Sequence, residues 1–114
     1  MEQWIRDEML LGADAMARLA ESHVAVFGIG GVGSFCAEAL ARGGVGELTL
    51  VDHDAVSLSN LNRQLCALHS TLGQGKAAVM ARRIAEINPA CRVHVLEKLY
   101  CEQEKATFFT SQYD

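Results

Sequence analysis

The sequence is poor in proline, in aromatic residues and in basic charge. It has a single proline, Pro89, and 6% aromatic residues in 114, so it contains no proline-rich linker and no obvious domain boundary. The formal net charge of −4, from 14 acidic and 10 basic residues, provides no basic field that would indicate nucleic acid as the dominant partner. Any RNA substrate would therefore need binding surface from elsewhere.

Closely paired cysteines and long apolar runs are also missing. The cysteines are spaced too widely for a Cys-x-x-Cys metal or redox pair, and the N-terminus does not resemble a signal peptide. Gly, Arg or Asp interrupts the apolar stretches before the roughly 20 residues that a membrane helix requires. We therefore expect a soluble protein of the reducing cytoplasm, with no membrane partner.

The hydrophobic pattern predicts one α/β domain over residues 1–114. Residues 4–21 have apolar positions at helical spacing, interrupted by Gly12, which predicts one or two short helices. Strands are predicted at 23–27, 47–52 and 92–96, helices at 32–42 and 77–87, and residues 105–114 as the end of a helix and the approach to a further strand. With N-terminal helices over 1–22 and a βαβαβ unit over 23–114, this is the first half of a Rossmann-like, doubly wound parallel sheet in three layers.

A glycine motif follows the first predicted strand and opens a helix. Gly28, Gly30 and Gly33 match G-x-G-x-x-G, with Gly31 inside it. Glycines allow the backbone to turn sharply and approach a phosphate, and the helix N-terminus presents unpaired N–H groups. Asp52, at the carboxyl end of the second strand, is placed to accept hydrogen bonds from a ribose hydroxyl. The motif predicts a nucleotide site, although NAD, or a turn needed only for helix–sheet packing, stays open.

The polar segment over residues 52–64 favours ATP, since an NAD fold commonly continues here with a short connection. Arg63 offers a planar charged fork for phosphate oxygens, and Lys76 adds a point charge at the start of the next helix. Asn60 and Gln64 supply neutral donors and acceptors. Taken singly these would be surface and turn residues, but two cations with a helix N-terminus suit a triphosphate better than a pyrophosphate bridge.

Three ordered motifs resemble those of the ThiF/MoeB/HesA superfamily of ubiquitin-activating-enzyme-like proteins: GIGGVGS at 28–34, LVDHDAVSLSNLNRQ at 50–64 and GKAAVMARRIAEINP at 75–89. The resemblance runs from about Arg6 to Val95 and implies an ATP-dependent adenylating enzyme that uses Mg²⁺. It implies that the glycines line the ATP site, that Asp52 binds the ribose, and that Asp54 is a further contact. The phosphates would be held by Asn60, Arg63, Gln64 and Lys76.

The N-terminal segment carries the remaining part of the resemblance. Arg6 is similar to an arginine that reaches into the ATP site of a dimer partner in this family, which implies a homodimer and makes Arg6, Arg63 and Lys76 the expected catalytic residues. The Arg-x-Glu-x-Leu-x-Gly pattern at 6–12 is more similar to the tRNA threonylcarbamoyladenosine dehydratase branch than to the adenylyltransferases. For that branch the resemblance implies that a carboxylate on a tRNA adenosine is adenylated by ATP and then closes into a ring.

Three functions stay open at this stage. They are the tRNA dehydratase, an adenylyltransferase that activates the C-terminus of a ubiquitin-like sulfur carrier, and a catalytically incomplete nucleotide-binding fragment. Relative to the family we expect the chain to be an N-terminal part, with the main magnesium ligand beyond Asp114. An unpaired edge on the first strand would favour self-association, through that edge or through the N-terminal helices.

Other reactive side chains are interpreted as structural. Cys36 and Cys66 are expected to be packing residues, because free cysteine is commonly buried. His53 could touch a base or ribose. The remaining histidines, including His23 and His94, show no ligand-like grouping in the sequence, and no metal site is predicted.

Overall fold

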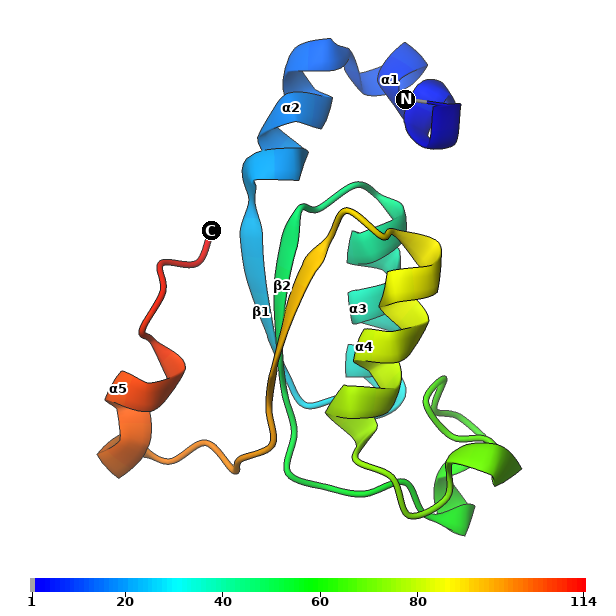
Figure 1. Ribbon diagram of the computed structural model, residues 1–114, viewed down its shortest axis with the longest axis vertical. Helices are drawn as coiled ribbons and strands as arrows, with labels where there is room; N and C mark the ends of the chain where they lie inside the picture. The colour runs from blue at the N-terminus through cyan, green and yellow to red at the C-terminus, as the bar shows by residue number, and fades with distance from the viewer. Residues whose placement is uncertain (1) are drawn as a thin grey trace.

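The computed structural model describes residues 2–114 as a three-stranded parallel sheet flanked by helices (Figure 1). The strands are β1 (His23–Phe27), β2 (Glu47–Val51) and β3 (Arg92–Leu96), in the spatial order β1-β2-β3. The helices are α1 (Ile5–Leu11), α2 (Ala13–Glu21), α3 (Gly31–Arg42), α4 (Lys76–Ile87) and α5 (Lys105–Phe108). The predicted α/β fold class is confirmed, and the predicted bounds of β2, α3 and α4 differ by one residue.

Alternation along the strands gives the sheet two different faces. Leu48 and Leu50 of β2 are fully buried and, with Val26 of β1, belong to the main hydrophobic core. On this side α3 and α4 pack against each other and against the sheet (Figure 1). The core therefore lies between the sheet and these two helices, and it fixes where both helices begin.

The opposite face carries the thinner third layer. Phe108 of α5 is fully buried, and its ring centroid lies 6.0 Å from that of Phe27. At the start of β1, the Asp114 N–H donates to the His23 carbonyl at 2.8 Å, and the Asp114 carboxylate accepts from the His23 N–H at 2.8 Å. The backbone groups of Ala25 and Phe27 also point away from β2, because alternate residues of a strand point to the same side. Among residues 2–114 they have no hydrogen-bond partner like that of His23. The expected unpaired edge is thus present along most of β1.

Charged residues occupy the amino ends of the strands on this same face. Glu47 accepts a hydrogen bond from Arg92 at 3.0 Å and lies 2.6 Å from the His94 ring nitrogen. The hydrogen bonds from His94 and Arg92 hold the pKa of Glu47 at about 2. The Glu47 carboxylate is therefore ionised at neutral pH.

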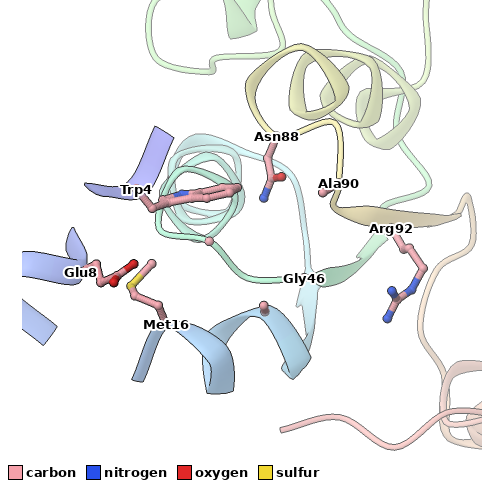
Figure 2. Close-up of a pocket in the computed structure, with 9 residues that line it drawn as sticks. Trp4, Glu8, Met16, Gly46, Asn88, Ala90 and Arg92 are labelled. Carbon is pink, nitrogen blue, oxygen red and sulfur yellow. The ribbon is translucent and has the colours of Figure 1, made fainter. Parts of the chain in front are cut away.

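The N-terminal helices are anchored by Trp4, which is 8% exposed and donates its indole N–H to the Arg42 carbonyl at 2.9 Å. Gly12, with φ 88°, separates α1 from α2, as the interruption in the helical pattern predicted. A cavity of about 150 Å³ remains beside Trp4, with Met16 on one side and Asn88 on another (Figure 2). No helix in residues 2–114 has both the length and the apolar character to cross a membrane.

The two central helices are tied together by Glu38 of α3, which accepts from Arg83 of α4 and from Arg42 at 3.2 Å. The hydrogen bond from Arg83 is the main reason that the pKa of Glu38 lies below its ordinary value. The prediction that Cys36 is a buried packing residue was wrong, because Cys36 is exposed. The residues that α3 buries are Ser34, Ala37 and Ala41. Cys66 is buried, as expected.

Candidate functional site

The loops at the carboxyl ends of the strands meet at one edge of the sheet, which is at the bottom of Figure 1. The turn after β1, the loop after β2 and the N-termini of α3 and α4 all lie there. In open parallel α/β sheets this edge is where ligands bind, because the helix N-termini point their unpaired N–H groups toward it. Most of the residues that sequence reasoning selected fall on these loops.

The glycine turn is built around two close approaches of backbone. Gly28 has φ 93°, a conformation that favours glycine, and its N–H donates to the Val51 carbonyl at 2.7 Å. A Cβ on Gly33 would lie 1.7 Å from the Gly28 carbonyl oxygen, so only glycine lets α3 start this close to the turn. The helix has no side-chain cap at Gly30. Its first N–H groups are therefore available to an anion.

Asp52 connects this turn to the loop after β2. Its Oδ2 accepts from the Ile29 N–H at 2.7 Å, and its Oδ1 accepts from the Asp54 N–H at 2.7 Å. Each carboxylate oxygen can accept two hydrogen bonds, so each Asp52 oxygen can still accept one from a ligand hydroxyl. The carboxylate that was expected to bind a ribose therefore also holds the backbone of the site.

A cavity of about 300 Å³ opens beside Asp52, and its wall includes Phe27, Val51, Lys98 and Tyr100. The Tyr100 ring meets the Phe27 ring edge-on, with centroids 5.6 Å apart. Desolvation raises the pKa of Tyr100, so its phenol stays neutral. The cavity combines an apolar wall with the carboxylates of Asp52 and Asp54, a combination that suits a nucleoside. Sequence reasoning missed Lys98 and Tyr100, whose only signal was their place directly after the third strand.

Arg63 and Gln64, from the loop after β2, pack against the glycine turn. A Cβ on Gly31 would lie 3.8 Å from the Arg63 Cγ, and one on Gly30 would lie 3.6 Å from the Gln64 Nε2. The Arg63 guanidinium donates to the Ser59 carbonyl at 3.0 Å and is exposed. It is thus oriented by its own loop while its charge remains open to the site.

Asn60 has a structural role that its sequence motif did not reveal. It is 6% exposed, and its Oδ1 accepts from the Ser57 N–H at 2.9 Å and from the Ser57 hydroxyl at 3.1 Å. These bonds close the 3-10 turn at Leu58–Asn60 that leads to Arg63. The amide oxygen therefore shapes the loop, which leaves the amide nitrogen as the group that can reach a ligand.

Lys76 begins α4 and is only 7% exposed. Its N–H donates to the Asp54 carbonyl at 3.0 Å, and its Nζ lies 3.9 Å from the Asp54 Oδ2. Asp54 is itself exposed and also lies 3.2 Å from the His53 ring. The carboxylate that faces this buried lysine is itself exposed to solvent, so it balances the lysine charge only in part, and a phosphate can neutralise the rest.

Cys66 and Arg6 lie outside this group for different reasons. Cys66 lies beneath the turn, with its Sγ 3.8 Å from the Ile29 carbonyl, and burial raises the pKa of its thiol. It is a packing residue and not an activated nucleophile. Arg6 is on α1, which lies at the other end of the sheet (Figure 1). The structure therefore does not bring Arg6 to the site of its own chain.

Comparison with known proteins gives matches over nearly the whole chain. The ThiF family matches residues 5–114. A tRNA threonylcarbamoyladenosine dehydratase from Bacillus subtilis is 51% identical over 109 residues, which cover 96% of this chain and 43% of that protein. A molybdopterin-synthase adenylyltransferase from Escherichia coli is 39% identical over 93 residues, which cover 82% of this chain and 37% of that protein.

A solved structure agrees with the fold. The crystal structure of the E. coli tRNA N6-threonylcarbamoyladenosine dehydratase in complex with ATP superposes with a TM-score of 0.95 at 44% identity, covering 98% of this chain and 46% of that one. The chain spans about two fifths of the length of the curated dehydratases that it matches.

The glycine turn provides a stability test with a control in the same turn. Gly33→Ala should lower the free energy of unfolding by about 2–4 kcal/mol, because its Cβ would meet backbone that cannot move without displacing α3. Gly31→Ala should change it by less than about 0.5 kcal/mol, because the added Cβ finds ordinary contact distances. Urea unfolding of both variants measures the difference. Equal stability of the two would contradict this packing.

Proposed function

The chain belongs to the ThiF family, and on that premise we propose that it binds ATP at the carboxyl edge of its sheet and adenylates a substrate carboxylate. The observation that supports this most is the convergence of the glycine turn, Asp52, Arg63 and Lys76 at one edge. The pyrophosphate bridge of NAD carries less negative charge than the triphosphate of ATP, so it would need fewer cations than Arg63 and Lys76 supply. The apolar wall beside Asp52 supplies a place for an adenine base.

We assign the site residues by the chemistry each can supply. The first N–H groups of α3 and the glycines Gly28, Gly30, Gly31 and Gly33 would receive the phosphates, and Asp52 would accept from the ribose hydroxyls. Arg63 and Lys76 would neutralise charge that develops on the phosphates, with Asn60 and Gln64 as neutral partners. Asp54 would hold Lys76 in place rather than contact ATP, because its carboxylate already faces that ammonium.

Magnesium would balance the remaining charge on the phosphates. Two carboxylates are present at the site, but the acceptor positions that the backbone leaves on Asp52 are assigned to the ribose hydroxyls, and Asp54 faces Lys76 and His53. This donor set is only partly suited to Mg²⁺, which prefers oxygen ligands in an open octahedral arrangement. We therefore propose that neither Asp52 nor Asp54 is its principal protein ligand.

We propose that the substrate class is that of the tRNA threonylcarbamoyladenosine dehydratases, because the chain is more similar to these relatives than to the adenylyltransferases. Identity is 51% to the B. subtilis dehydratase and 39% to the E. coli adenylyltransferase. In the proposed reaction the threonylcarbamoyl carboxylate attacks the α-phosphate, pyrophosphate leaves, and an internal nucleophile closes a ring on the activated carbonyl as AMP departs. Such a reaction would take place in the cytoplasm, where tRNA is modified. The net charge of −4 requires that tRNA find basic surface elsewhere.

We propose a homodimer assembled through α1. This helix exposes Ile5, Met9, Leu10 and Leu11, with 57%, 80%, 86% and 57% of their surfaces accessible. An apolar surface of this kind on a short helix marks an interaction site. Arg6 lies on this same helix, and we propose that it serves the nucleotide site of the second copy.

Pyrophosphate release separates the candidate reactions. We expect ATP-dependent release that requires tRNA bearing threonylcarbamoyladenosine and is absent with the same tRNA lacking the threonylcarbamoyl group. The alternative, activation of a ubiquitin-like sulfur carrier, predicts stimulation by the carrier, and stimulation by the carrier alone would contradict our assignment. ATP binding without release in either assay would identify the chain as a catalytically incomplete nucleotide-binding fragment.

Dimerisation has its own test. Leu10→Asp should convert the dimer to a monomer without unfolding it, because it places a charge in the proposed interface but leaves the core intact. Leu68→Asp, at another exposed leucine, should leave the dimer unchanged. Sedimentation velocity of the three proteins measures this, and a wild-type chain that stays monomeric at high concentration would rule out the interface.

A further inference from the structure

Two histidines and a glutamate meet at the amino ends of the strands, at the end of the sheet opposite the nucleotide site. The ligand atoms of His23, Glu47 and His94 all lie within 4.8 Å of one another. This corrects the expectation that these histidines have no ligand-like grouping. The reason is the strand register, which places His23 beside Glu47 and places Thr49, the next residue on the same face, beside His94.

We propose that His23, Glu47 and His94 form a binding site for a divalent transition-metal ion of the zinc type. Two imidazoles and one carboxylate are a donor set that zinc takes in proteins. Each ligand would come from a different strand, so a bound ion would connect β1, β2 and β3 at their amino ends.

The spacing of the donor atoms suits one small ion after minor adjustment. The His94 Nε2 lies 2.6 Å and the His23 Nδ1 lies 3.8 Å from the same Glu47 oxygen, Oε2. Tetrahedral zinc with bonds of about 2.0–2.2 Å places its ligand atoms roughly 3.3 Å apart, between these two values. His94 is half exposed, so rotation of its side chain can provide the change.

The surrounding hydrogen bonds orient the ligands as a metal site requires. The His23 Nε2 lies 2.7 Å from the Thr49 hydroxyl, so an Nε2–H that donates there leaves the Nδ1 lone pair directed toward Glu47. The other glutamate oxygen, Oε1, accepts from Arg92 at 3.0 Å, and Oε2, which the His94 Nε2 contacts in the free protein, is the oxygen that would bind the ion. Partners of this kind fix the tautomer and the direction of metal ligands.

Room remains for a fourth ligand. A cavity of about 500 Å³ borders His23 and Glu47 and is lined also by Glu21, Ser111, Gln112 and Asp114. His23 is 8% exposed at its side chain, Glu47 22% and His94 52%, so the group is accessible from solvent on one side. Three protein ligands with one open position describe the site, and a water molecule can complete the coordination.

Titration of the 114-residue chain with Co²⁺ and with Zn²⁺ tests the proposal. Co²⁺ should give the intense visible absorption of tetrahedral coordination at one ion per chain, and Zn²⁺ should displace it. His94→Gln should weaken the affinity by roughly 100-fold or more, as expected for loss of a direct ligand. Because His94 is half exposed, this variant should keep its fold, which circular dichroism checks.

Two controls separate this site from other donors on the chain. Asp52, His53 and Asp54 form a second group of possible ligands, so His53→Gln should bind Co²⁺ as the wild type does. Zn²⁺ should raise the melting temperature of the wild type and of His53→Gln, but not that of His94→Gln. The proposal is wrong if His94→Gln binds as tightly as wild type, if no 1:1 complex forms, or if a thiolate charge-transfer band shows that cysteine binds Co²⁺.

Discussion

The candidate nucleotide site depends on one carboxylate that accepts two backbone N–H groups from separate segments. Asp52 holds the turn after β1 through Ile29 and the loop after β2 through Asp54. Hydrogen bonds of this charged kind each contribute about 1.5–3 kcal/mol. If this carboxylate were lost, the glycine turn and the loop that carries Arg63 would no longer share a fixed position. The close approach at Gly33 and the burial of Cys66 beneath the turn depend on the same arrangement.

The sequence contained enough local information to predict most of this edge. Strand alternation, helix stop signals and the glycine spacing act over a few residues, so they predicted the three strands and the helices α3 and α4 to within one residue. They also predicted the loops that carry Gly30 and Arg63. The three ordered motifs also indicated the ThiF family, and the family match over residues 5–114 confirms this. The roles of the individual site residues stay predictions.

What the sequence could not predict arises from contacts between distant segments. The wall made by Lys98 and Tyr100 depends on how the chain turns after β3, and the grouping of His23 with His94 depends on strand register. Cys36 was misplaced for a related reason: its spacing fits a helix face, but packing against the sheet selects the face of Ala37. The two ends of the sheet thus acquire different chemistry, with the glycine turn, Arg63 and Lys76 at one end and the imidazoles of His23 and His94 at the other.

Calorimetric titration of ATP and of NAD tests the account most directly, because nucleotide choice depends on the cations that the Asp52 framework positions. We predict saturable ATP binding that Arg63→Ala and Lys76→Ala each weaken by about tenfold or more, equivalent to roughly 1.4 kcal/mol. Arg18→Ala, an exposed arginine on α2, should have no effect. Binding of NAD in preference to ATP would contradict the proposed site. An ATP affinity that neither Arg63→Ala nor Lys76→Ala changes would also contradict it.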